Sequence, residues 1–195
     1  IVGNDNFTLA NGVTSGSGTA GDPYIIEGWD ISAENANGIE IRNTTAHFVI
    51  RNCYIHDGKD NNMNGIHFGN VTNGRIENLV LENNYLGITL ASTKNSWIKN
   101  CTCSRNGNGI RLEYSNNNTL ENNSCSNNEI GIFLGYLGNN TLKNNSCSSN
   151  SYSGILLFSS SSNVLSNNAC SINYRSIYLT SYSPNNTLDN NVCSN

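Results

Sequence analysis

The sequence predicts an all-β fold, a right-handed parallel β-helix (solenoid) of about eight stacked coils of roughly 22 to 24 residues each. Three observations predict it. Apolar residues recur in register along the chain, apolar and polar residues alternate within each repeat, and asparagine supplies about a fifth of the residues. Alternation is typical of strands, and a repeat of this length is typical of proteins built from stacked units.

The first strand of each repeat is marked by a column of Ile or Leu. Its members are Ile26, Ile50, Ile76, Ile98, Leu120, Leu142, Leu165 and Leu188. A second column, mostly after Gly, marks another strand and contains Ile39, Ile66, Ile88, Ile110, Ile132, Ile155 and Ile177. One coil cannot bury its apolar side alone, whereas stacking about every 4.8 Å builds a continuous core.

Asparagine and cysteine columns are expected to line the inside of the coils. Asparagine tolerates the left-handed conformation of tight corners, and stacked amides hydrogen-bond between coils. The predicted internal asparagine ladder is Asn52, Asn78, Asn100, Asn122, Asn144, Asn167 and Asn190. The predicted cysteine ladder, interpreted as small core residues, is Cys103, Cys125, Cys147 and Cys170, with Cys193 in the last coil.

Two segments are expected, a partial N-terminal cap at residues 1–24 and the parallel β-helix at residues 25–195. The chain begins at Ile1 rather than Met, so we expect that an upstream segment has been removed. No C-terminal cap is expected, and an open coil would template pairing with another chain. Charged residues are only 12% of the chain and the net charge is −4, which argues against a nucleic-acid partner. No apolar run is long enough for a membrane span.

The repeats resemble the NosD-like and carbohydrate-binding/sugar-hydrolase (CASH) families of β-helix proteins, as found in archaeal surface-layer and sheath proteins. The resemblance rests on Asn-Gly-Ile-x-Leu, as at 108–112, followed by Asn-Asn-Thr-Leu-x-Asn-Asn at 117–123, and on the entry segment 16–29. It covers the chain from about residue 16 to 195. It implies the fold and leaves function open, because this fold carries lyases, hydrolases, binding modules and scaffolds.

Candidate chemistry is sparse. The short motifs of β-helix polysaccharide hydrolases do not occur and no lyase motif is recognisable, so the chain is expected not to be an enzyme and to need no cofactor. The densest polar group is the loop at residues 56–64, with Asp57, Lys59, Asp60 and, at its ends, His56 and His67. It is interpreted as a solvated loop, with a sugar or metal site as the alternative.

A copper role is a further alternative, since copper favours His, Met and thiolate ligands. The metal candidates are His56, Met63 and His67, which flank the same loop. By contrast, charges of alternating sign at one position of six consecutive coils are interpreted as an external ion-pair ladder. These are Glu27, Arg51, Glu77, Lys99, Glu121 and Lys143.

The leading hypothesis is a structural subunit of an extracellular assembly, such as a sheath or surface layer, with a second copy of itself as partner. Cys53, Cys101 and Cys193 are the candidates for intermolecular disulfides, because the first two stand outside the cysteine column. Phe133, Leu156 and Tyr178 are expected to form an exposed assembly stripe. Asn6, Asn70 and Asn185 are candidate glycosylation sites. The alternatives are a carbohydrate-binding or polysaccharide-cleaving β-helix and a copper-binding module.

Overall fold

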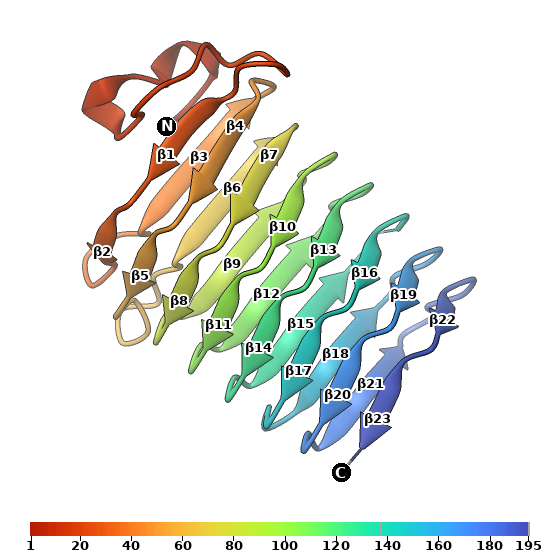
Figure 1. The fold of residues 1–195 in the computed structure, drawn as a ribbon. Coiled ribbons are helices and arrows are strands. Elements are labelled where there is room, and N and C mark those ends of the chain that lie inside the picture. The colour runs from red at the N-terminus through yellow and green to blue at the C-terminus, as the bar shows by residue number, and fades with distance from the viewer. Residues whose placement is uncertain (137, 195) are drawn as a thin grey trace.

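Three parallel β-sheets run the length of the molecule (Figure 1). The computed structural model describes residues 1–136 and 138–194, and each turn of the chain over these residues adds a strand to each sheet in succession. Strands of neighbouring coils are parallel and in register, so Ile76 pairs with Ile98 and Ile98 with Leu120. The predicted right-handed parallel β-helix of about eight coils is confirmed.

The strands are short and follow a fixed order within each coil. Sheet B contains β1 (Tyr24–Glu27), β4 (Phe48–Arg51), β7 (Gly74–Glu77), β10 (Trp97–Lys99), β13 (Thr119–Glu121), β16 (Thr141–Lys143), β19 (Val164–Ser166) and β22 (Thr187–Asp189). Sheet C contains β2 (Asp30–Ser32), β5 (Tyr54–His56), β8 (Val80–Glu82), β11 (Thr102–Ser104), β14 (Ser124–Ser126), β17 (Ser146–Ser148), β20 (Ala169–Ser171) and β23 (Val192–Ser194). Sheet A contains β3 (Ile39–Thr44), β6 (Ile66–Val71), β9 (Leu86–Ala91), β12 (Asn108–Glu113), β15 (Ile130–Gly135), β18 (Ser153–Phe158) and β21 (Arg175–Thr180).

The core is a stack of inward-facing side chains from all three sheets. Ile76 of sheet B, Leu81 of sheet C and Leu90 of sheet A are fully buried and belong to one continuous cluster. Each side chain lies against its equivalents in the coils before and after, which removes it from water. Burial of this kind stabilises the fold by roughly 1.5–3 kcal/mol for each Ile or Leu.

The predicted internal asparagine ladder is wrong in position, because its members lie on the outside of the corners. Asn52, Asn78, Asn100, Asn122, Asn144, Asn167 and Asn190 are exposed and have φ between 50° and 56°. Their amides still meet between some coils, since Asn100 Nδ2 donates to Asn78 Oδ1 at 3.1 Å. The corner needs a left-handed residue, and asparagine adopts that conformation more readily than most.

One buried ladder lies one residue after the predicted column in each coil, and the structure contains two further buried ladders. Their members are Asn123, Asn145, Asn168 and Asn191; Asn84, Asn106, Asn128, Asn150 and Asn173; and Asn118, Asn140, Asn163 and Asn186. Asn145 shows the pattern: its Nδ2 donates to Leu120 O at 3.0 Å, and its Oδ1 accepts from Asn123 N at 3.0 Å. Each amide therefore pairs backbone groups that the corners leave without a sheet partner.

The cysteine column is confirmed. Cys103, Cys125, Cys147 and Cys170 pair in register in sheet C and are buried, and the column ends at exposed Cys193. The expectation that Cys53 and Cys101 can meet another chain is wrong, because they are 3% and 1% exposed and belong to the core. They occupy the buried corner position that asparagine takes in later coils, where the thiol of Cys101 contacts Lys99 O at 3.4 Å.

The two ends of the solenoid differ. Residues before β1 include two short 3-10 turns, η1 (Asn4–Asn6) and η2 (Leu9–Asn11), and lie across the first coil (Figure 1). Phe7 stacks on Tyr24 with ring centroids 4.7 Å apart. At the last coil, Leu188 is 46% exposed whereas its equivalent Leu165 is fully buried.

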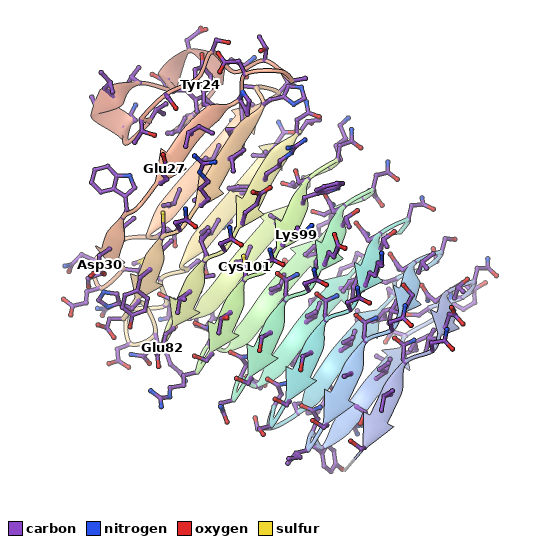
Figure 2. All side chains as sticks on the ribbon, viewed as in Figure 1. Tyr24, Glu27, Asp30, Glu82, Lys99 and Cys101 are labelled. Carbon is purple, nitrogen blue, oxygen red and sulfur yellow. The ribbon has the colours of Figure 1, made fainter. Side chains whose placement is uncertain are left out.

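Part of the expected charge ladder forms ion pairs on sheet B, where Figure 2 labels Glu27 and Lys99. Arg51 Nε lies 2.7 Å from Glu27 Oε2, and Lys99 Nζ lies 3.5 Å from Glu121 Oε2. The Lys143 ammonium lies 3.9 Å from the other oxygen of Glu121. All these side chains are partly exposed, so each pair contributes about 0–1 kcal/mol.

Candidate functional site

The outer face of sheet A carries buried polar atoms that lack hydrogen-bond partners. Within the described residues these atoms are Asn64 Oδ1, Thr89 Oγ1, Asn108 Nδ2, Ser153 Oγ and Arg175 Nη1. Leaving such an atom unpaired costs about 1–3 kcal/mol, so native structures contain few of them. Their concentration on one face marks it as the candidate functional site.

Strand register places these atoms in two adjacent columns on that face. The first column runs along Leu86, Asn108, Ile130, Ser153 and Arg175. The second runs along His67, Thr89, Arg111, Phe133, Leu156 and Tyr178. Asn64 belongs with the first column, because it precedes Ile66 by two residues as Leu86 precedes the paired Ile88.

Two tyrosines stand at the corner where strands of sheet A end. Tyr114 follows β12 and Tyr136 follows β15, and their rings stack with centroids 5.3 Å apart and planes 11° apart. The ring of Phe158 meets Tyr136 edge-on, also at 5.3 Å. Both tyrosines are exposed and have φ of 50° and 55°, which is unfavourable for a bulky side chain. The same corner is left-handed in other coils, at Ser92 and Ser159, so this conformation belongs to the solenoid, and the tyrosines are distinguished by their exposed rings.

The predicted assembly stripe lies on this face, but its expected exposure is wrong. Phe133 and Leu156 are only 9% and 6% exposed, and they form a cluster with Ile130 that is separate from the core. They are covered because neighbouring coils supply large side chains, including Arg111, whose guanidinium carbon lies 4.3 Å from the Phe133 ring centroid. Tyr178 packs at the edge of this cluster and is partly exposed.

The opposite edge of the face, where strands of sheet A begin, carries Tyr152, Tyr174 and Arg175. The guanidinium of Arg175 lies 4.9 Å from the ring of Tyr152, 4.8 Å from that of Tyr174 and 4.5 Å from that of Tyr178. A shallow polar groove reaches this edge from the corner of sheet C and is lined by Lys59, Asn106, Gly107, Asn127, Asn128, Glu129, Ser149, Ser151 and Tyr152. The outer face of sheet A thus comprises the two columns and the aromatic residues at both edges.

The loop singled out from the sequence lies mainly on another surface. His56 ends β5 in sheet C, and its Nε2 lies 3.0 Å from Asp30 Oδ1 and its Nδ1 2.7 Å from Asp57 Oδ2 (Asp30 is labelled in Figure 2). The ring of Tyr54 stacks on His56 at 4.5 Å. The hydrogen bond to Asp57, followed by that to Asp30, raises the pKa of His56. Both ring nitrogens are therefore engaged by carboxylates.

Apart from Asp57, the candidates of that loop do not gather around His56. Asn83 donates to Asp57, which together with His56 lowers the pKa of this carboxyl group. Lys59 Nζ donates to Arg105 O at 3.2 Å, and Asp60 is exposed. His67 belongs to β6 in sheet A, and burial lowers its pKa.

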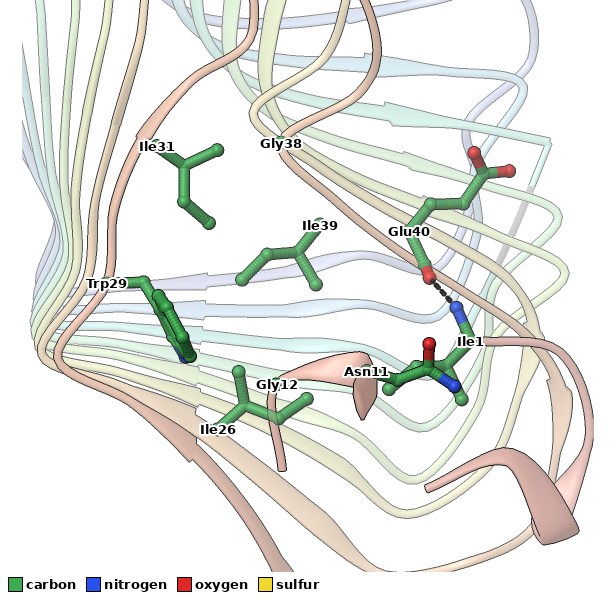
Figure 3. Close-up of a pocket in the computed structure, with 9 residues that line it drawn as sticks. All are labelled: Ile1, Asn11, Gly12, Ile26, Trp29, Ile31, Gly38, Ile39 and Glu40. Carbon is green, nitrogen blue, oxygen red and sulfur yellow. Dashed lines mark hydrogen bonds between the residues drawn. The ribbon is translucent and has the colours of Figure 1, made fainter. Parts of the chain in front are cut away.

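A small apolar pocket lies at the N-terminal end of the solenoid (Figure 3). Its lining is Ile1, Asn11, Gly12, Ile26, Trp29, Ile31, Gly38, Ile39 and Glu40. The backbone nitrogen of Ile1 donates to Glu40 O at 2.7 Å. Its volume of about 280 Å³ is at the lower limit for a ligand pocket.

The described residues include no helix that is long and apolar enough to cross a membrane.

Comparison with known families identifies the chain. The model of the family described as periplasmic copper-binding protein (NosD) matches residues 17–195. The chain belongs to the NosD family. No curated protein sequence matches it at a significant level.

Several solved structures share the fold of this NosD-family chain. The mannuronan C-5 epimerase A-module of Azotobacter vinelandii has a TM-score of 0.69 and 14% identity, over 86% of this chain and 57% of that one. A mutant of a periplasmic alginate epimerase has a TM-score of 0.70 and 19% identity, over 86% of this chain and 50% of that one. Endopolygalacturonase I from Stereum purpureum has a TM-score of 0.66 and 13% identity, over 88% of this chain and 68% of that one. The chain thus spans about half the length of the epimerases.

These neighbours correct the expectation that the chain is not an enzyme. Two of them are epimerases and one is a polygalacturonase, so the fold carries carbohydrate-active enzymes. The expectation rested on missing hydrolase and lyase motifs, and their absence does not bear on epimerase chemistry. None of the comparisons supports a sheath or surface-layer subunit, nor an archaeal source.

The described residues do not fit a copper centre. No group of three or more His, Cys, Asp or Glu side chains among them is placed to hold a metal ion. His56 and His67 lie on different sheets, and Met63 packs against the core. The thiol groups of the cysteine column are buried, apart from Cys193.

The sequence interpretation missed the tyrosines of the outer face of sheet A and Arg175. A signal for the tyrosines was present, since Tyr114 and Tyr136 are one coil period apart, as are Tyr152 and Tyr174. An aromatic residue that recurs with the coil period stacks on itself, and an exposed stack of rings is typical of a binding surface.

Proposed function

We propose that the chain is a carbohydrate-recognising β-helix that binds an extended glycan along the outer face of sheet A. One observation carries the proposal: exposed tyrosine rings stand at both edges of that face, and a polar groove adjoins one of these edges. Sugars offer the complement of this surface, since hydroxyl groups pair with polar atoms and the apolar faces of sugar rings pack on aromatic rings.

The repeat of the fold suits a polymeric ligand. Adjacent coils present equivalent positions about 4.8 Å apart along the axis. This spacing is similar to the length of one sugar in an extended chain, so consecutive sugars would meet consecutive coils. The exposed rings of Tyr114 and Tyr136, one coil apart, would then contact neighbouring sugars with the ring surface that their mutual stacking leaves free.

The comparisons support this function without testing it. The epimerases are described as acting on mannuronan or alginate, the polygalacturonase structure contains galacturonate, and all share the fold at low identity. A location in the periplasm or outside the cell fits the description of the family and of the alginate epimerase. Whether the chain also cleaves or epimerises the bound glycan is measured in the same experiment.

The test is glycan binding by the full chain, with a double Tyr114→Ser, Tyr136→Ser variant. Serine already occupies the same corner in neighbouring coils, at Ser92 and Ser159, with φ of 51° and 48°. The variant therefore keeps the backbone and removes only the rings. Glycan arrays identify a ligand, and affinity electrophoresis measures how tightly the chain binds it. We expect binding to weaken about tenfold or more.

The matched control is Trp97→Ala, which removes an equally exposed aromatic ring from sheet B. It should leave glycan affinity unchanged. Release of reducing ends and proton NMR of the glycan report cleavage and epimerisation in the same samples. Wild-type chain that retains no glycan, or equal weakening by Trp97→Ala, would overturn the proposal.

A further inference from the structure

Arg175 is a cation enclosed by aromatic rings on the outer face of sheet A. It begins β21, and its backbone nitrogen donates to Tyr152 O at 3.0 Å. Its guanidinium lies within 5 Å of the ring centroids of Tyr152, Tyr174 and Tyr178. Such contacts stabilise the charge through the ring faces.

The rings do not satisfy the hydrogen-bond donors of Arg175. Its Nη1 is buried and has no acceptor among the described residues. Four of the other five arginines pair with a glutamate: Arg42, Arg51, Arg105 and Arg111 with Glu40, Glu27, Glu82 and Glu113. The fifth, Arg75, has no ion pair among the described residues but is exposed to solvent. Within the described chain no carboxylate forms an ion pair with Arg175, although Glu129 lies in the adjoining groove.

A guanidinium with unfilled donors favours an oxyanion, because its planar fork matches the two oxygens of a carboxylate or sulfate. The neighbouring groups are suited to the sugar that would carry that anion. Tyr174 is 70% exposed and offers a ring to that sugar.

We propose that Arg175, with Tyr152, Tyr174 and Tyr178, forms a subsite for one anionic group of the glycan, a carboxylate or a sulfate ester. This rests on the proposed function and adds the substrate class, an acidic polysaccharide. The equivalent positions in the preceding coils, Ser153, Ile130 and Asn108, are uncharged. The subsite therefore binds one charged sugar at a fixed place on the face.

Titration calorimetry of the full chain tests the subsite with neutral, carboxylated and sulfated oligosaccharides of equal length. We expect an anionic oligosaccharide to bind about tenfold more tightly than the neutral one. Whichever anionic ligand binds more tightly identifies the source of the charge. Arg175→Gln should abolish this preference, while Arg175→Lys should keep part of it.

Arg75→Gln is the matched control, because Arg75 also lies over an aromatic ring, that of Trp97 at 5.6 Å, but belongs to sheet B. Tyr174→Ala, at an exposed position, provides a second variant should Arg175→Gln fail to fold, and it should reduce the anionic preference. If the wild type binds neutral and anionic glycans equally, or if neither Arg175→Gln nor Tyr174→Ala lowers the preference, the subsite is wrong and the proposed function stands. If the wild type binds no glycan, both are wrong.

Discussion

Single residues decide whether a corner of this solenoid is stable. The two members of each Asn-Asn pair are identical in sequence but have different structural roles. Asn144 is exposed and left-handed, with φ of 56°, while Asn145 is buried and pairs backbone groups of the preceding coil. The first residue satisfies a conformational demand and the second a hydrogen-bonding demand.

This difference predicts unequal effects of neighbouring substitutions. Asn145→Ala leaves Asn123 N and Leu120 O without partners inside the core, and we expect it to lower the free energy of unfolding by about 3 kcal/mol. Asn144→Gly should change it by less than about 1 kcal/mol, since glycine adopts the left-handed region freely. Urea unfolding followed by circular dichroism measures both. Equal losses would show that the ladder assignment is wrong.

The cysteines also behave individually. Burial raises the pKa of Cys101 to about 12, so its thiolate is scarce near neutral pH and its sulfur is inaccessible. We expect an aromatic disulfide reagent to modify one thiol in the native chain, at Cys193, and all seven cysteines after denaturation. Cys193→Ser should remove the rapid reaction. Rapid modification of Cys53 or Cys101 would instead support the intermolecular disulfides expected from the sequence.

At the scale of elements, sheet B shows how charge fixes which coil lies on which. Lys99 stands in register between Glu77 and Glu121, so opposite charges face each other across two strand pairs. A shift of the chain by one coil would bring like charges together, which opposes misregister more than it stabilises the native pairing.

Reversal of the central charge tests this arrangement. Lys99→Glu places three carboxylates in consecutive coils, and we expect a loss of about 1 kcal/mol in the free energy of unfolding that shrinks as salt is added. Lys99→Arg keeps the sign of the charge and should fall within experimental error. Thermal unfolding of both variants at low and high ionic strength measures the two changes in stability. Similar losses for both variants would mean that packing, and not charge, matters here.

Across the whole molecule, the sequence was sufficient for the architecture because the architecture is periodic. The Ile and Leu columns are read directly from spacing, and Ile76, Ile98 and Leu120 do pair as predicted. Side-chain orientation at the corners was not predictable in the same way, since Asn122 and Asn123 are chemically identical and only the backbone conformation distinguishes them.

The candidate site was harder to predict for a related reason. Phe133 points outward by alternation, yet it is buried by side chains from the coils on either side. Burial on an outer face depends on several coils at once. The unpaired nitrogen of Arg175 is likewise invisible in a sequence, because it depends on which rings and carboxylates come near in space.

The direction of the hydrogen bonds has a mechanical consequence. Backbone ladders of all three sheets and the buried amide ladders all join one coil to the next. Tension along the long axis therefore passes through every junction in series, so the weakest junction sets the force at which coils separate. Tension across the strands must shear many junctions together. The molecule is thus compliant lengthwise and stiff sideways, and a polymer that bridges several junctions would act as a splint along its weaker direction.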